Sequence, residues 1–467
     1  MNIKEQSRQT PVVAKTDVLV AGAGPAGVIA AVAAARNGAK TILIEKNTFP
    51  GGNMALGLPF LGFFNDKQKQ IVGGIPWELV ERLVKAKASP GPWFTDPALK
   101  YKDSMVVFDL PVFRTVLYKM LSESGVNLLL HTLVSCPIMA GNRIKGVIVE
   151  SKAGRQAILA KTVIDASGDG DVAARAGAPF EKGHPQNALL QPTTLIFEVV
   201  NVDMDTLFAD VKKRPGDYHI HSRKAATRYL PDYRRGVRMG ITGLEKICQK
   251  ATAKGDYDVP NPYVILTCMP RKGVLMVNMA KVKGVDGTDN RSLSHAEMEG
   301  CENIHKVMYF LKKYVPGMKN AQVDWIAPAI GIRETRRIVG KYTLTEQDMR
   351  ARTKFEDRIA LGGRYIDVHD PTPDNTGKSI YMTFPDGYFI PFRSLVPQKI
   401  NHLLTAGRCI SVSYAAFGST RVMAQCMATG QAAGTAAALA ARRNCSVREI
   451  NIGELQKKLR QQGAIIG

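Results

Sequence analysis

A glycine pattern in the first fifty residues allows few local structures. Gly22, Gly24 and Gly27 form a GxGxxG pattern between an apolar, β-rich run over 16–21 and an alanine-rich stretch over 25–37 that we expect to be helical. In such a strand–turn–helix unit, the first glycine allows a tight turn, the second lets the backbone approach a pyrophosphate, and the third permits close helix–strand packing. The free N–H groups at the helix start then hold phosphate charge.

A second β-rich run over 40–45 ends at Glu45. An acid at this place, roughly 20 residues beyond the glycines, hydrogen-bonds ribose hydroxyls, and its charge repels a 2′-phosphate. The alternative is a structural glycine turn without a ligand, but strand, helix and acid together favour a dinucleotide, FAD or NAD. Lys46 comes next, and a glycine loop containing Gly52 and Asn53 is suited to run beneath a flavin.

The remaining pattern predicts an α/β protein with a discontinuous, Rossmann-like FAD/NAD(P)-binding domain and an inserted α+β substrate or cap domain. Alternating runs separated by glycine turns predict a β-meander over 132–166. From about residue 183, polar and basic helical stretches alternate with short β runs. We therefore expect the first part of the binding domain over 1–182, the inserted domain over 183–325, and the second part with its C-terminal helix over 326–467.

Four further motifs carry a resemblance to a known family. They are TVIDASGDGD at 162–171, IRETRRI at 332–338, IPFRSLVP at 390–397 and GRCIS at 407–411. With them, nearly the whole chain resembles the FAD-dependent oxidoreductases of the two-dinucleotide-binding-domain superfamily. More narrowly, it resembles a bacterial FAD-dependent oxidoreductase family that includes the flavin portion of heterodisulfide reductase. The resemblance implies FAD as the cofactor.

The resemblance also implies contacts with FAD. The Val134 backbone would contact adenine, the turn at 166–169 would line the ADP side, and Gly407 with Arg408 would contact the ribityl–pyrophosphate part. A long helix is expected over roughly 421–442, with the segment from Gly418 as its start and the helix N-terminus directed toward the flavin. The alternative is a helix that only packs against its neighbours. The full set of predicted cofactor-binding residues is Gly22, Gly24, Pro25, Ala26, Gly27, Glu45, Lys46, Gly52, Asn53, Met54, Val134, Ala166, Ser167, Gly168, Asp169, Gly407, Arg408, Gly418, Val422 and Met423.

The cysteines limit the other cofactors. There are seven, scattered along the chain, and none forms a CxxC pair. This pattern argues against a disulfide framework, a zinc site or a cysteine-ligated iron–sulfur cluster, and we expect no metal. A second GxGxxG in a strand–helix setting is also missing, so we expect no built-in NAD(P)H site. An external electron acceptor or donor is therefore expected.

Two arginines are candidates for binding a substrate. A strand is expected over 331–344, and period-2 alternation would place Arg333 and Arg337 on one face and Glu334 and Arg336 on the other. Two guanidinium groups on one face would clamp a carboxylate. The alternative, which we weigh about evenly, is an internal ion pair between Glu334 and an arginine.

His369 is the candidate for proton transfer, because a loop histidine near the flavin can take a substrate proton while hydride leaves. Taken alone, the residue is more often a surface or core histidine. Tyr388 and Arg393 flank a strand-like segment and would line the same cavity, and His184 is a weaker candidate.

The formal net charge is +22, with the basic excess densest over 212–254. Such a field can attract anionic substrates, a membrane surface or nucleic acid, but a solvated basic surface is favoured, so no nucleic-acid partner is expected. The chain start has no apolar signal segment, and no stretch is apolar enough to span a membrane, so we expect a cytoplasmic protein, with a homo-oligomer as one option.

The favoured function is hydride transfer between a small organic, possibly anionic, substrate and flavin N5. The first alternative is partner-dependent electron transfer, with the chain acting as the flavin subunit of a larger complex. The second is a tRNA-modifying flavoprotein, which the net charge of +22 suggests.

Overall fold

The computed structural model describes residues 3, 8–94, 104–220, 240–369, 371–372 and 380–467. Its larger sheet has the order β6-β2-β1-β9-β8-β7, and β21 also pairs with β9. Strands β6, β2, β1, β9 and β21 run parallel, whereas β8 is antiparallel to β9 and β7. The strand bounds are β1 Val12–Ala21, β2 Thr41–Ile44, β6 Asn127–Leu129, β7 Leu133–Ala140, β8 Arg143–Ser151, β9 Gly154–Asp165 and β21 Leu403–Thr405.

Strand β9 pairs with β1 along one edge and is long enough to pair with two strands along the other. Its first half pairs with β8, and its last three residues, Val163 to Asp165, pair with β21. The parallel strands read as continuous apolar runs because both of their faces are covered, as is usual for parallel sheets. The carboxyl ends of β1, β2 and β9 consequently meet at one edge, where ligands bind in folds of this type.

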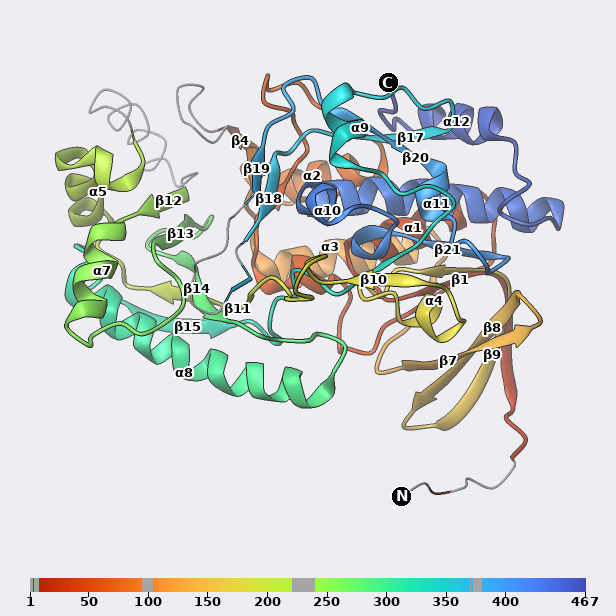
Figure 1. The fold of residues 1–467 in the computed structure, drawn as a ribbon, viewed down its shortest axis with the longest axis horizontal. Coiled ribbons are helices and arrows are strands. Elements are labelled where there is room, and N and C mark those ends of the chain that lie inside the picture. Colours follow the sequence, from red (N-terminus) through yellow and green to blue (C-terminus); the bar gives the residue numbers. More distant parts are fainter. Residues whose placement is uncertain (1–2, 4–7, 95–103, 221–239, 370, 373–379) are drawn as a thin grey trace.

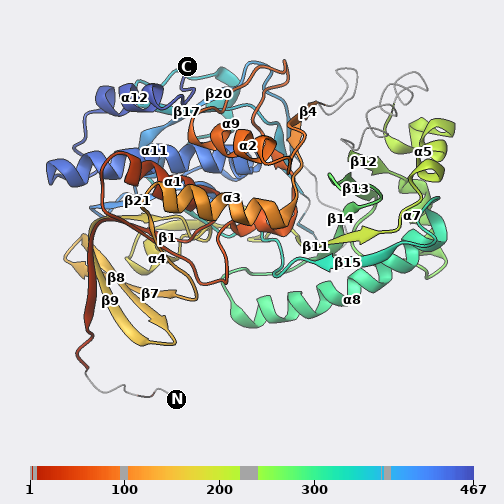
Figure 2. The ribbon, with the colours of Figure 1, turned by 180° about the vertical axis from the view of Figure 1, so that it is seen from behind.

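Three helices cover the parallel strands: α1 (Pro25–Arg36), α3 (Leu110–Glu123) and α11 (Met423–Arg443), and α2 (Ile75–Lys85) packs on them (Figures 1 and 2). α1 and α11 are rich in alanine and glycine, so their backbones approach closely. The α11 glycines Gly430 and Gly434 lie directly against the carbonyl oxygens of Ala26 and Ala30 in α1.

A second, antiparallel sheet has the order β12-β13-β14-β11-β15 and its own apolar core. The long helix α8 (Asn290–Tyr314) packs on β14 and β11, and this unit lies to one side of the parallel sheet (Figure 1). The strand bounds are β11 Thr193–Val200, β12 Gly240–Gly243, β13 Val264–Cys268, β14 Leu275–Val282 and β15 Gln322–Ile326, and the other helices of the unit are α5 (Met204–Lys213) and α7 (Glu245–Ala253).

Short elements connect the two sheets. β10 (Phe180–Lys182) pairs antiparallel with β16 (Arg336–Ile338) where the chain enters and leaves the second sheet. The remaining strands are β3 Phe60–Leu61, β4 Pro92–Phe94, β5 Ser104–Val106, β17 Arg358–Gly362, β18 Ile366–Val368, β19 Ile380–Met382 and β20 Tyr388–Pro391, and the remaining α-helices are α4 Asp171–Arg175, α9 Glu346–Ala351, α10 Tyr414–Thr420 and α12 Ile452–Gln461. The protein is therefore a mixed α/β fold with a Rossmann-like parallel sheet and a second antiparallel sheet; the domain boundaries at 182/183 and 325/326 stay a prediction.

Two expectations about local structure are wrong. Only Arg336–Ile338 of the expected strand over 331–344 is a strand, because Glu334 turns inward to bond Arg337 three residues later. The expected single C-terminal helix is two helices. Ser413 caps the short α10, and Val422, in an extended conformation, separates it from α11, which begins at Met423.

Among the helices of the described residues, none is both long enough and apolar enough to cross a bilayer. Within the same residues, no group of three or more His, Cys, Asp and Glu side chains is arranged to hold a metal ion.

Candidate functional site

A cavity opens at the carboxyl ends of β1, β2 and β9, between the start of α1 and the segment that follows β21. The predicted cofactor-binding residues that line it are Gly22, Gly24, Pro25, Ala26, Glu45, Lys46, Gly52, Asn53, Val134, Ala166, Ser167, Gly168, Gly407, Arg408 and Met423. The predicted residues outside its lining are Gly27, Met54, Asp169, Gly418 and Val422. Further lining residues beyond the predicted set include Asn47, Thr132, Asp171, Arg421 and Cys426.

The three motif glycines have different surroundings. Gly22 has a φ of +95° and lies against Ala166, whose carbonyl oxygen would be 2.7 Å from a Cβ. A Cβ on Gly27 would be 1.8 Å from the Gly22 carbonyl oxygen, so this glycine serves helix–turn packing. A Cβ on Gly24, by contrast, would meet no protein atom within 4 Å. The open space beside Gly24 is therefore room for a ligand.

The start of α1 is equipped to bind an anion. Gly24 is the N-cap residue, no side chain caps the helix, and the first turn holds no acidic residue. The N–H groups of the first turn and the positive end of the helix dipole therefore point toward the cavity, where phosphate groups bind in such units.

Glu45 is held rigidly at the end of β2. Its carboxylate accepts hydrogen bonds from the backbone N–H of Ala23 at 2.8 Å and from the backbone and side-chain N–H groups of Asn47 at 2.9 and 2.8 Å. Because a carboxylate offers about four acceptor sites, one remains for a hydroxyl group in the cavity. This arrangement suits a ribose with a free 2′-OH.

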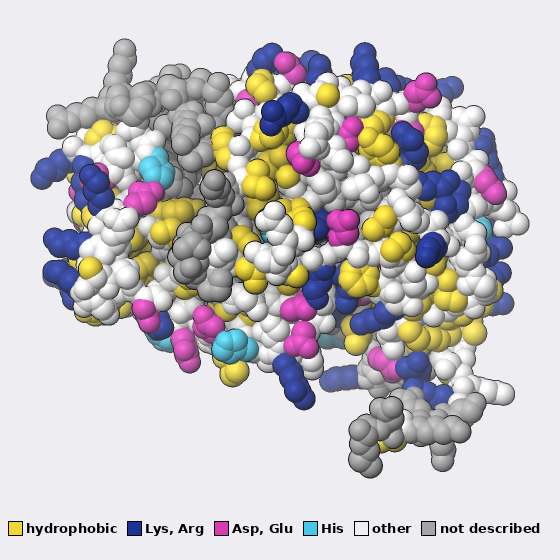
Figure 3. All heavy atoms as spheres, in the orientation of Figure 1, with side chains coloured by type: hydrophobic (Ala, Val, Ile, Leu, Met, Phe, Trp, Pro, Cys, Tyr) yellow, Lys and Arg dark blue, Asp and Glu magenta, His cyan; other side chains and the backbone are white. Residues whose placement is uncertain are grey.

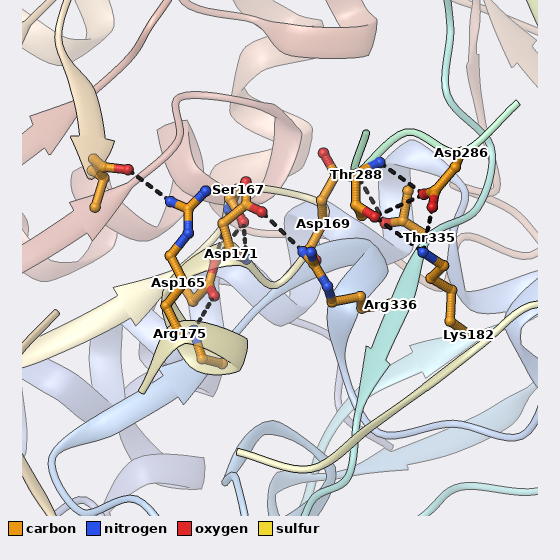
Figure 4. A network of polar contacts seen from close by, with 12 residues as sticks. Asp165, Ser167, Asp169, Asp171, Arg175, Lys182, Asp286, Thr288, Thr335 and Arg336 are labelled. Atoms are coloured by element: carbon orange, nitrogen blue, oxygen red, sulfur yellow. Dashed lines mark hydrogen bonds and ion pairs between the residues drawn. The ribbon is translucent and has the colours of Figure 1, made fainter. Parts of the chain in front are cut away.

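The Asp165 side chain holds the turn after β9 in place through hydrogen bonds (Figure 4). The fully buried Asp165 accepts hydrogen bonds from Ser167 Oγ at 2.6 Å and from the Ala173 N–H at 2.8 Å. Burial raises the pKa of Asp165, and these hydrogen bonds oppose the rise. The turn is thereby held at the cavity edge, with Ser167 and Gly168 in its lining.

Asp169 faces the other way, toward the connection with the second sheet. Its Oδ1 accepts hydrogen bonds from Thr335 at 2.7 Å and Arg408 at 2.9 Å, and its carbonyl oxygen accepts one from Arg336 at 3.1 Å (Figure 4). Asp169 therefore positions Arg408 in the cavity wall but does not line the cavity itself.

Two buried polar atoms of cavity-lining residues, Arg408 Nη1 and Arg421 Nε, have no hydrogen-bond partner among the described residues, and neither has Gln425 Oε1 in the first turn of α11. Such atoms are costly unless a ligand or water satisfies them. Two cationic side chains fit the negative charge of FAD, and the Gln425 carbonyl can accept a hydrogen bond from a polar ring edge. Together with the space beside Gly24, these donors and acceptors fit the FAD that the resemblance implies.

Gly418 does not start the long helix, and this expectation is corrected. It lies in α10, where a Cβ would be 2.8 Å from Val368 Cγ2, so it packs against β18 rather than lining the cavity. The helix that begins at the cavity is α11; its first residue Met423 lines the cavity, and its N-cap residue Val422 provides no side-chain cap.

A cluster of charged side chains adjoins the cavity through Arg421. Asp367 Oδ2 lies 3.7 Å from nitrogen atoms of Arg364, His369 and Arg421. Burial acts to raise the pKa of Asp367, but His369 and the arginines together lower it below its ordinary value. The pKa of His369, which is 19% exposed, is lowered well below its ordinary value by burial, and the Asp367 charge only partly opposes this. Burial thus favours the neutral form of His369, which has a free nitrogen that can accept a proton.

Arg333 and Arg337 do not form the expected carboxylate clamp. Arg337 Nη1 donates to Glu334 Oε1 at 2.7 Å in a buried ion pair, the alternative left open by the sequence. Arg333 donates to the Pro192 carbonyl at 2.6 Å and to Thr194 Oγ1 at 2.8 Å. The two side chains separate because the segment between them is not a strand.

The other predicted substrate-site residues lie apart. The Tyr388 hydroxyl is buried 2.6 Å from Ser419 Oγ, and burial raises its pKa. Arg393 is 49% exposed, bonds Asp357 at 3.0 Å and does not line the cofactor cavity, so its place in a substrate cavity stays a prediction. The His184 ring packs edge-on against Tyr414 at 4.9 Å.

The basic stretch over 212–254 is described only in part, because Arg223, Lys224, Arg234, Arg235 and Arg238 lie outside the described residues. On the face in Figure 3, lysine and arginine side chains are spread over the surface and mixed with acidic ones.

The profile of a family described as FAD dependent oxidoreductase matches residues 17–459. Solved structures with a similar fold include a geranylgeranyl bacteriochlorophyll reductase-like protein from Thermoplasma acidophilum (14% identity, 97% of this chain and 84% of that chain, TM-score 0.48). A triple mutant of a flavin-dependent brominase aligns at 12% identity over 96% and 84%, with a TM-score of 0.45. An anhydrotetracycline hydroxylase from Streptomyces rimosus aligns at 12% identity over 95% and 64%, with a TM-score of 0.43. No curated protein matches the chain.

Proposed function

This chain belongs to the family of FAD-dependent oxidoreductases, and from that premise we propose that it transfers a hydride between a small organic substrate and FAD bound in the cavity. The observation that carries the proposal is the position of Arg421. Arg421 lines the cavity, as Met423 does, and its Nη2 lies 3.7 Å from Oδ2 of Asp367, the partner of His369. A group that can move a proton therefore adjoins the cofactor cavity.

The chain's own residues would hold FAD along the cavity. The first turn of α1 would bind the pyrophosphate over Gly24, and Glu45 would bind the adenosine ribose. Val134 would contact the adenine, and Arg408 and Met423, which also line the cavity, would lie toward the flavin. The start of α11, which no side chain caps, would direct its N–H groups toward the ring, and Gln425 Oε1 would supply an acceptor.

Bound FAD supplies the two-electron chemistry, because its ring nitrogen N5 accepts or gives a hydride. In the direction of oxidation, a substrate C–H bond breaks and both electrons leave with the hydrogen. His369 takes the second hydrogen as a proton from a neighbouring O–H, N–H or C–H group. Asp367 stabilises the imidazolium that results. The two electrons then pass to an external acceptor.

The second candidate is partner-dependent electron transfer, as in the flavin portion of heterodisulfide reductase. It is favoured by one observation: the seven cysteines are scattered and free, so electrons cannot leave through a cluster of the chain's own cysteines. Under this proposal a separate iron–sulfur protein is the acceptor, and it should co-purify with the chain.

The test is to purify the chain and record its visible spectrum. We expect flavin absorbance, and anaerobic bleaching of the long-wavelength band by some members of a panel of small alcohols, amines and acids. A colourless protein that does not take up added FAD would end both candidates. Bleaching only after an iron–sulfur partner is added would favour the second.

A further inference from the structure

We propose that the substrate is a small carboxylate and that Lys281, together with Arg333, is its anchor. This inference rests on the proposed function, because it concerns the same site. Neither residue is paired with a carboxylate among the described residues, although both are close to the cavity-side cluster around Asp367.

Lys281 is a charged residue in an apolar strand. It lies in β14 directly opposite Thr194 of β11, so the two side chains share one face of the second sheet. Arg333 donates to the Thr194 hydroxyl at 2.8 Å, which brings the guanidinium to the same face. Lys281 is 4% exposed, and its Nζ lies 5.2 Å from the centre of the Tyr263 ring. No hydrogen bond or ion pair to this Nζ involves any residue that the structure describes.

Among the residues that the structure describes, the cationic side chains in this region outnumber the carboxylates left to pair with them. Asp367 is the carboxylate of the cluster, and it already faces Arg364, His369 and Arg421 at 3.7 Å each. Glu334 does not help, because it is paired with Arg337. Burying an unpaired cation is costly, so a site with an excess of buried cations is completed by an anionic ligand.

The region also connects to the cavity. Arg421 lines the cavity and contacts Asp367, and its charge acts on Arg333 and His369. A carboxylate held by Lys281 and Arg333 is thus placed at the flavin end, beside the proposed proton acceptor. Lysine and arginine are the side chains that bind carboxylates most strongly.

The alternative is a purely structural lysine that stays neutral. Burial, and next the Arg333 charge, lower the pKa of Lys281 to about 7, while Asp367 opposes and Lys283 adds to the fall. The Lys281 ammonium group lies over the face of the Tyr263 ring, and the charge of Lys281 helps to lower the pKa of His369. A bound carboxylate would favour the protonated form, so carboxylate binding should weaken as the pH rises above 7.

The test uses the FAD-loaded protein and three probes: acetate, benzoate and succinate, each compared with its neutral amide. Binding is read from the rise in unfolding temperature with probe concentration and, independently, from changes in the flavin spectrum. We expect at least one carboxylate to bind and its amide not to bind. In Lys281→Met the dissociation constant should rise by about 10- to 100-fold, and Lys281→Arg should restore part of the affinity.

Lys272→Met is the matched control, because Lys272 is exposed in the turn before β14 and lies outside the site. It should bind the carboxylates like the wild type. Equal affinity in Lys281→Met and wild type, equal effects of acids and amides, or no binding of any probe would overturn the inference. The unfolding readout does not need flavin, so the apoprotein keeps the test valid even if the chain takes up no FAD and the proposed function fails.

Discussion

The Glu45 carboxylate accepts a 2.8 Å hydrogen bond from the backbone N–H of Ala23, which joins the end of β2 to the glycine turn after β1. The acid is 5% exposed and also receives both N–H groups of Asn47. One side chain therefore shapes the turn and offers its remaining acceptor site to the cavity. The two roles of Glu45 can be separated by measurement.

Glu45→Gln should weaken FAD binding and lower stability. The glutamine side chain has one acceptor oxygen, so an N–H of Ala23 or Asn47 loses its partner and faces an NH₂ group, at a cost of about 1–3 kcal/mol. The measurements are FAD titration and chemical unfolding of the apoprotein. Glu302→Gln, on the exposed side of α8, is the control and should change neither. Unchanged FAD affinity in Glu45→Gln would contradict the ribose assignment.

Gly24→Val should remove FAD binding while leaving the fold intact. The φ of Gly24 is −74°, which any residue adopts, and its Cβ would enter open space in the cavity, so the valine blocks the ligand rather than the protein. We expect a colourless protein with a near-normal unfolding temperature. Gly216→Val is the control, since Gly216 is exposed and a Cβ there also meets no atom within 4 Å. A yellow Gly24→Val protein would show that the pyrophosphate lies elsewhere.

His369→Gln should lower kcat by about 10²- to 10⁴-fold without changing FAD content, because glutamine cannot take the proton. Steady-state kinetics with a substrate found by anaerobic bleaching gives the result, and the exposed His305→Gln is the control. Burial lowers the pKa of His369, so its imidazole stays unprotonated at a lower pH than that of a free histidine. The wild-type kcat should therefore show no decline between pH 7 and pH 6. A decline centred on the ordinary histidine pKa would argue against His369 as the base.

Lys281→Met should stabilise the free protein at low pH. The pKa of Lys281 is lowered from 10.5 to about 7 in the fold. The penalty of the buried charge is therefore fully present below pH 7 and is lost as the pH rises toward 10.5. Removing it should add up to about 5 kcal/mol of stability at pH 6 and little at pH 10. The free energy of unfolding is measured by chemical unfolding at pH 6 and at pH 10, with Lys272→Met as the control. Equal stability of Lys281→Met and wild type at pH 6 would mean that Lys281 carries no such penalty.

Gly434→Ala should lower the unfolding temperature. Its Cβ would lie 2.1 Å from the Ala30 carbonyl oxygen, so α1 and α11 would have to separate, at a cost of about 1–3 kcal/mol. Gly216→Ala, where no neighbour is met, should be close to neutral. Wild-type stability in Gly434→Ala would mean that the two helices adjust without cost.

The phosphate-binding unit could be predicted because its chemistry is local. Gly22, Gly24 and Glu45 lie within one β1–α1–β2 unit, and a hydrogen bond between Ala23 and Glu45 joins the two ends of that unit. The resemblance added Ala166 and Arg408, which line the same cavity from distant segments. The single charged residue in the apolar run LMVNMAKV over 275–282 is the sequence signal that marks Lys281.

The substrate side depended on the tertiary structure. Alternate residues share a face only in a strand, and Glu334 lies before β16 begins at Arg336. Glu334 pairs with Arg337, so an ion pair replaces the expected clamp of Arg337 with Arg333. Lys281 meets Arg333 only because β14 pairs with β11, whose Thr194 binds that arginine. A dinucleotide turn is thus readable in the order of residues along the chain, since hydrogen bonds within one β–α–β unit build it. A cluster of charges from four separate segments cannot be predicted in this way, because only the tertiary packing of those segments brings the charges together.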